Sequence, residues 1–252
     1  MRSNAMPTVS ASGLSPASRG WLLGALGVAI FALSIPMTRL AGGSVADPQL
    51  PPAFVAIGRA ALAGLLSLAW LLAVRAPRPT RAQWPALAVG SAGVVFGWPL
   101  FLGFAVREVD AVHASMVSGL LPIATATLAA LWLRQHPGWR FWACALAGTA
   151  LVLGYIAWRG AAHWQGADGL LIAAVLCSAM GYVAGASLSA DGPGRPAMPA
   201  EQVICWILVI SLPLTLPLTL WVWPTAPARA SAWGGFLYVS VFSMWLGFFA
   251  WY

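Results

Sequence analysis

The chain has 252 residues, of which 60% are hydrophobic and only 8% are charged. A soluble domain carries about a quarter charged residues, so this composition excludes a water-facing exterior over most of the molecule. All 13 basic residues are Arg and contribute to a net charge of +7, but they stand singly, without the basic run typical of nucleic-acid binding. We therefore expect a protein whose partner is the lipid bilayer, and no nucleic-acid partner.

Eight apolar stretches follow one another along the chain. A helix needs about 20 apolar residues to cross a bilayer, and each stretch is long enough to do so. Short linkers rich in Pro, Gly and Arg separate them. Because lipid-exposed backbone must satisfy its own hydrogen bonds, we predict an all-α integral membrane protein, a multi-span helical bundle. The predicted spans are 20–40, 54–74, 82–106, 109–133, 139–158, 168–190, 202–223 and 231–252.

Residues 1–19 are polar and predict a disordered tail ahead of the first span. The distribution of Arg at the span ends favours a cytoplasmic N-terminus, because cytoplasmic loops carry the excess of basic residues. We expect a multi-pass protein of the bacterial inner membrane in this orientation. It places Arg2, Arg19, Arg75, Arg78, Arg81, Arg134, Arg140 and Arg195 inside, against Arg39, Arg107, Arg159 and Arg229 outside.

The two halves of the chain share weak sequence echoes. PLFLGFAV in the third span and SMWLGFFA in the eighth share Leu-Gly-Phe at an offset of 144 residues. GWLLGALG opens the first span, and GLLIAAVL opens the sixth 149 residues later. Spans six to eight are therefore predicted to repeat spans one to three. A repeat of five spans crosses the membrane an odd number of times, so the second copy would be inverted, a recurring plan for secondary transporters.

At this point the sequence resembles EamA-type members of the drug/metabolite transporter superfamily. The likeness rests on WLLGALGVAIFALSIPMTRLA, FVAIGRAALAGLL, AVHASMVSGLLPIATATLAALWL and GLLIAAVLCSAMGYVAGASLS in spans one, two, four and six. It implies ten helices in two inverted five-helix repeats that carry small solutes through a central cavity. The fourth span departs from the family, since LRQHPG stands where a Gly-Glu pair is usual.

The resemblance assigns residues 20–158 to a complete first repeat of five helices and residues 168–252 to a second repeat of only three. The chain ends inside an apolar segment, FSMWLGFFAWY, without a polar tail. We therefore expect the natural reading frame to continue past Tyr252, or the chain to be a fragment that lacks two helices and transports little by itself.

Two deep tryptophans are candidates for the cavity wall. Most of the Trp residues lie near span ends, as in an interfacial belt, whereas Trp98 and Trp245 lie within spans. The repeat alignment places Trp245 one helical turn from the position of Trp98, so we expect similar surroundings for both rings. Ordinary packing is the alternative. Polar candidates at helical spacing are Ser34, Ser118, Ser178, Tyr182 and Ser243, and the family likeness adds Pro36 and Pro122 as flanking hinges.

Charged groups are scarce within the spans. Arg59 is expected near the outer face, either as a snorkelling side chain that fixes helix packing or as a cation at the cavity mouth that attracts anionic substrates. His113 near the outer surface is either an interfacial His or a proton carrier. No Asp or Glu falls in a span interior, since Asp168 stands at a span end.

The function that combines these features is transport of small organic metabolites, with export as the expected direction and alternating access as the mechanism. A non-transporting structural or regulatory bundle is the alternative. An intramembrane enzyme is disfavoured because no catalytic motif or paired carboxylate appears, and we expect no catalytic residue, cofactor or metal. Small residues at four-residue spacing favour close helix packing within the chain and leave a homodimer possible.

Overall fold

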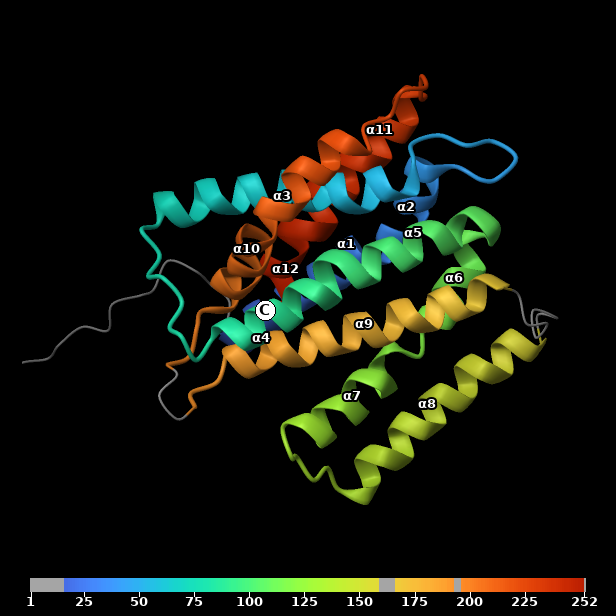
Figure 1. Ribbon diagram of the computed structural model, residues 1–252. Coiled ribbons are helices and arrows are strands. Elements are labelled where there is room, and N and C mark those ends of the chain that lie inside the picture. Colours follow the sequence, from blue (N-terminus) through green and yellow to red (C-terminus); the bar gives the residue numbers. More distant parts are fainter. Residues whose placement is uncertain (1–15, 159–165, 193–195, 252) are drawn as a thin grey trace, which may run out of the picture.

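The computed structural model describes residues 16–158, 166–192 and 196–251, and its regular structure is helical (Figure 1). No strand occurs among these residues, although Gly43 and Pro48 form an isolated bridge. The predicted tail lies outside the described residues up to residue 15, and the first helix begins at Pro16. The elements, with η for π-helix, are α1 (Pro16–Ala32), α2 (Ser34–Gly42), α3 (Pro52–Ala73), α4 (Trp84–Gly90), η1 (Ser91–Gly97), α5 (Trp98–Glu108), α6 (Ala111–Ser118), α7 (Leu121–Trp132), α8 (Trp139–Trp158), α9 (Gly166–Leu188), α10 (Ala200–Trp221), α11 (Ala230–Leu237), η2 (Tyr238–Leu246) and α12 (Gly247–Trp251).

The helices confirm a multi-span membrane bundle. Within the described part of the chain, seven helical stretches are long and apolar enough to cross a membrane, and they match the first four and last three predicted spans. The fifth predicted span, 139–158, forms the 20-residue helix α8. Large apolar side chains face outward, with Leu72 69% exposed, Leu131 72% and Leu220 73%. Such a surface is compatible with lipid and not with water.

Three prolines lie where a span changes its helical form. Proline has no N–H, so the carbonyl four residues earlier loses its helical partner. The first span breaks between α1 and α2 at Leu33, three residues before Pro36. The third span changes from η1 to α5 beside Pro99, and the fourth turns between α6 and α7 just before Pro122. Each of these three spans therefore changes its helical form at or near a proline.

Small residues allow two pairs of helices to approach closely. A Cβ added at Gly93 of η1 would lie 2.2 Å from the carbonyl oxygen of Cys177 in α9, so the two backbones touch. A Cβ at Gly64 of α3 would lie 2.7 Å from Leu212 Cδ2 of α10. The predicted small-residue contacts therefore occur inside this chain.

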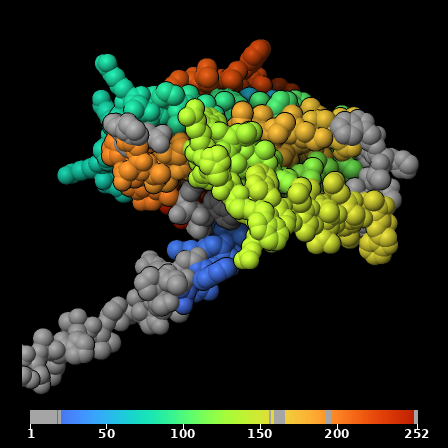
Figure 2. Space-filling view, turned by 90° about the horizontal axis from the view of Figure 1, so that it is seen from below, coloured from blue at the N-terminus to red at the C-terminus, as the bar shows by residue number. Residues whose placement is uncertain are grey.

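Helices α7 and α8 lie at one edge of the bundle (Figure 1) and stand out on the face seen in Figure 2.

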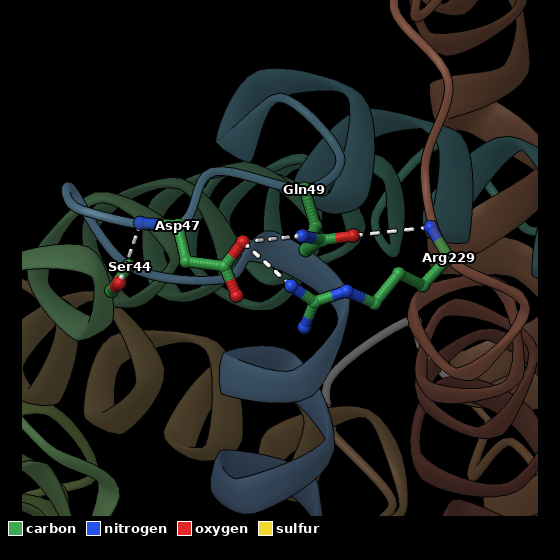
Figure 3. Close-up of polar contacts among 4 residues, drawn as sticks. All are labelled: Ser44, Asp47, Gln49 and Arg229. Carbon is green, nitrogen blue, oxygen red and sulfur yellow. Dashed lines mark hydrogen bonds and ion pairs between the residues drawn. The ribbon is translucent and has the colours of Figure 1, made fainter.

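Polar contacts join the loop after α2 to the start of α11 (Figure 3). Arg229 Nη2 lies 2.9 Å from Asp47 Oδ1, and the backbone N–H of Arg229 donates to Gln49 Oε1 at 3.1 Å. Gln49 Nε2 donates to the same Asp47 oxygen at 3.0 Å. The charged side chains are 65% and 53% exposed, so this ion pair contributes less than about 1 kcal/mol in water. It marks the ends of the first and eighth spans as neighbours.

Candidate functional site

A cavity of about 180 Å³ lies where six of the spans meet. It is reached by side chains from spans one to four, six and eight, and both halves of the chain contribute to its wall. Its polar lining is Ser34, Arg59, Ser118, Ser178, Tyr182 and Ser243, and its apolar lining is Phe31, Ile35, Val94, Trp98, Leu121, Met244 and Phe248.

A hydroxyl pair joins the first and eighth spans at the cavity wall. Ser34 begins α2 directly after the break at Leu33, and its Oγ donates to Ser243 Oγ at 2.7 Å. The two side chains are 7% and 3% exposed and stand 209 residues apart in the chain. Buried hydroxyl groups are normally hydrogen-bonded, and here the two hydroxyls bond each other.

Arg59 brings a full charge into the cavity wall. It is the eighth residue of α3, about 10 Å along the helix from Pro52, and it is only 3% exposed. Its Nη2 donates to Met244 Sδ at 3.4 Å, which is a weak acceptor. Its Nε and Nη1 have no hydrogen-bond partner among the described residues. A buried cation in this state is costly, because neither water nor a counter-ion replaces its hydration.

Aromatic rings form much of the rest of the wall. Phe248 of α12 packs edge-on against Phe31 of α1, with ring centroids 5.2 Å apart. It also contacts Tyr182 of α9, with centroids 6.2 Å apart. Trp98 stands half-buried at the start of α5. The cavity thus combines one cation and several hydroxyls with an apolar, aromatic surface, a combination typical of sites for small organic molecules.

Comparison with known proteins identifies the family. Residues 18–157 match the EamA-like transporter family. The chain belongs to this family. A curated relative, "Uncharacterized transporter YdeK" of Bacillus subtilis (strain 168), is 37% identical over 245 residues, covering 95% of this chain and 80% of the relative. A crystal structure of a protein shares the fold at 19% identity, with a TM-score of 0.64 over 94% of this chain and 78% of the other. The resemblance drawn from the sequence is confirmed, and the molecule is a multi-pass membrane transporter.

Most of the residues singled out in the sequence of this EamA-like chain come together. The cavity brings the candidates from different spans within reach of one ligand. Arg59 lies buried in the cavity wall, on the helix α3 against which α10 and η2 pack. The sequence candidates that line the cavity are Ser34, Arg59, Trp98, Ser118, Ser178, Tyr182 and Ser243.

Trp245 does not line this cavity, and the expectation of similar surroundings for the two tryptophans is wrong. Its ring packs against Phe249, with centroids 5.3 Å apart, beside the core of buried residues around Cys205 and Ile207. Its Nε1 has no hydrogen-bond partner in the described structure. The reason is local: Trp245 belongs to the π-helix η2, whose wider turn shifts side chains away from the register of an α-helix.

The two hinge prolines also lie outside this cavity. Pro36 is exposed, and it stands two residues from Ser34, which places it on another face of α2. Pro122 is exposed as well and borders a different cavity of about 530 Å³ between α7 and α8. Their backbone effect on the spans remains, whereas their side chains do not contact the central cavity.

His113 lies apart from the cavity in a buried hydrogen-bonded pair that the sequence did not indicate. Its Nε2 lies 2.6 Å from Asp168 Oδ1, and the two side chains are 9% and 10% exposed. Asp110 caps α6 by accepting the backbone N–H of His113 at 2.7 Å. Asp168, which the sequence places at a span end, is in the first turn of α9, and packing of α9 on α6 buries it. The sequence could place Asp168 at the start of a helix, but it could not identify His113, 55 residues away, as its partner.

Proposed function

We propose that this EamA-like transporter carries small organic metabolites through the central cavity by alternating access, in the direction of export. The observation that supports this role is the cavity itself. It is bounded by both halves of the chain and lined by hydroxyls, one cation and aromatic rings. A volume of about 180 Å³ is close to the roughly 150 Å³ that accommodates a benzene molecule. The solute is therefore a small organic molecule of about that size.

The helix pairings support two inverted repeats, residues 20–158 and 168–252. The second and seventh spans, α3 and α10, pack on each other. The third span packs on the sixth through η1, α5 and α9, and the eighth packs on the first through α12 and α1. This is the pattern expected if spans six to eight repeat spans one to three. Each of the two corresponding spans also contains a π-helix, η1 ending at Gly97 ahead of the first Leu-Gly-Phe and η2 ending at Leu246 within the second. Rocking of two such units about a shared site produces alternating access.

Blocking the cavity tests the proposed function even while the solute is unidentified. Ser118 and Ser115 lie on the same helix, and the Oγ of each donates to the carbonyl four residues earlier. Ser118 lines the cavity, whereas Ser115 is exposed. Ser118→Phe is expected to fill the cavity and abolish transport, and Ser115→Phe is the matched control on the lipid-facing side.

The measurement is untargeted profiling of metabolites in the medium and inside cells, with and without the gene. Metabolites that accumulate outside in the presence of the wild-type protein are expected to persist with Ser115→Phe and to return to baseline with Ser118→Phe. Equal profiles for the two variants at matched expression would refute transport through this cavity. No change in any metabolite would favour a structural or regulatory bundle.

The proposed orientation places the N-terminus in the cytoplasm of a bacterial inner membrane. Val45 in the loop after α2 is 67% exposed and would lie outside, whereas Arg78 after α3 would lie inside. Cysteines at these two positions, in a background in which the exposed Cys144 is replaced by Ser, report the orientation. We expect an impermeant thiol reagent to label Val45→Cys in intact cells and Arg78→Cys only after lysis. The reverse pattern would invert the topology.

A further inference from the structure

The charge of Arg59 is the feature of the cavity that needs a ligand. Of the described residues that line the cavity, Arg59 is the only one with a formal charge. It carries five N–H donors, and one of them makes a long hydrogen bond to a thioether sulfur. The donors on Nε and Nη1 face no acceptor within the described structure. A guanidinium cannot relieve this cost by losing its proton at neutral pH, because it stays charged in proteins.

No carboxylate of the described chain is available to neutralise this cation. Asp168 is bonded to His113, Asp47 pairs with Arg229, and Asp110 caps α6. None of these acids lines the cavity. The remaining described acids stand at helix ends or in loops, at Glu108, Asp191 and Glu201. The described residues therefore supply no counter-charge for Arg59 in the cavity, and an anionic ligand would supply one.

The other walls define the rest of the ligand. Phe31, Trp98 and Phe248 present rings, which suit an apolar body. The polar lining other than Arg59 consists of neutral hydroxyls, and those of Ser34 and Ser243 already bond each other. An ammonium group on the ligand would find no negative partner there and would be repelled by the guanidinium.

We propose that the cavity binds small organic monoanions, with a carboxylate on Arg59 and an aromatic or branched apolar body against the ring wall. This assignment rests on the proposed transport function for its biological role, since it names the chemical class of the solute. Binding itself can be measured without transport.

Binding of matched probes to the purified protein in lipid nanodiscs tests the proposal. The probes are benzoate, its neutral isostere benzamide, and benzylammonium, measured by calorimetry at neutral pH. We expect benzoate to bind at least about tenfold more tightly than benzamide, which corresponds to about 1.4 kcal/mol. Benzylammonium is expected not to compete. Benzoate binding no tighter than benzamide binding, or no benzoate binding at all, would overturn the proposal with the wild-type protein alone.

Variants then assign the effect to Arg59. Arg59→Gln is expected to remove the preference for benzoate, and Arg59→Lys to retain part of it because the positive charge stays. Arg229→Gln is the control, since this Arg is exposed and does not line the cavity, and this variant is expected to bind as the wild type does. An unchanged preference in Arg59→Gln would contradict the assignment.

The outcome separates this inference from the proposed function. If the protein prefers benzoate but the metabolite profile of cells does not change, the anion site is supported and the transport role is refuted. If the metabolite profile depends on the cavity but the protein shows no preference for benzoate, the transport role is supported and the anion site is refuted.

Discussion

The close contact between η1 and α9 predicts opposite effects for one substitution at two glycines. At Gly93, an added Cβ would lie 2.2 Å from the carbonyl oxygen of Cys177 and 2.9 Å from the backbone nitrogen of Gly181. Ordinary contacts of this kind are about 3.4 Å or more, and backbone atoms cannot rotate out of the way as side chains do. In Gly93→Ala, the two helices must therefore separate by about 1 Å. At Gly148 of α8, nothing lies within 4 Å of the added Cβ.

The magnitudes follow from these distances. Overpacking costs roughly 1–3 kcal/mol, and a radial gap of up to 1 Å removes a quarter to a half of the dispersion energy of the contacts along it. We take about 3 kcal/mol for Gly93→Ala, because both obstacles are backbone atoms, and subtract about 1 kcal/mol for the better helix propensity of Ala. The net loss in free energy of unfolding is about 2 kcal/mol. Gly148→Ala gains the better helix propensity of Ala without any overpacking. It is therefore expected to be as stable as the wild type, or more stable by up to about 1 kcal/mol in the free energy of unfolding.

Equilibrium unfolding in mixed detergent micelles measures the difference between the two variants, which we expect to be about 2–3 kcal/mol in the free energy of unfolding. Helix content by circular dichroism checks that both variants fold before denaturation. A Gly93→Ala protein as stable as Gly148→Ala would show that η1 and α9 do not touch through their backbones, and the arrangement of the third and sixth spans would have to be revised.

Two further predictions concern the site and its surroundings. Trp98→Ala is expected to reduce transport per folded molecule, because this ring lines the cavity. Trp245→Ala is expected to lower the free energy of unfolding by about 3 kcal/mol and to leave transport per folded molecule nearly unchanged, because its ring packs against the core. Equal transport losses for the two variants, compared at the same amount of folded protein, would contradict this division. Asp168→Ala removes the hydrogen-bonded partner of buried His113 and is expected to cost about 2 kcal/mol, against less than about 1 kcal/mol for Asp47→Ala in its exposed pair. Thermal unfolding of the two Asp variants side by side checks the ranking, and a larger effect at Asp47 would refute it.

Composition and local pattern determined the class of this protein and the bounds of its helices. An apolar run of about 20 residues in lipid has one way to satisfy its backbone, so the spans could be marked from the sequence. Seven of the eight were found within about three residues of their predicted ends. The effect of Pro36, Pro99 and Pro122 on helix form was also local, because a missing N–H acts on the carbonyl one turn earlier. Arg59 could also be nominated from the sequence, since a guanidinium inside a span is rare.

Tertiary structure decided which of these residues meet. Ser34 and Ser243 are 209 residues apart, and His113 and Asp168 are 55 apart, so no local signal links either pair. Trp245 was misplaced because the repeat alignment was combined with an α-helical period, whereas this segment folds as the π-helix η2. Spacing within a helix fixes only the relative directions of its own side chains. Which direction faces a cavity depends on how the helix is rotated against its neighbours, and that rotation is set by contacts between distant parts of the chain.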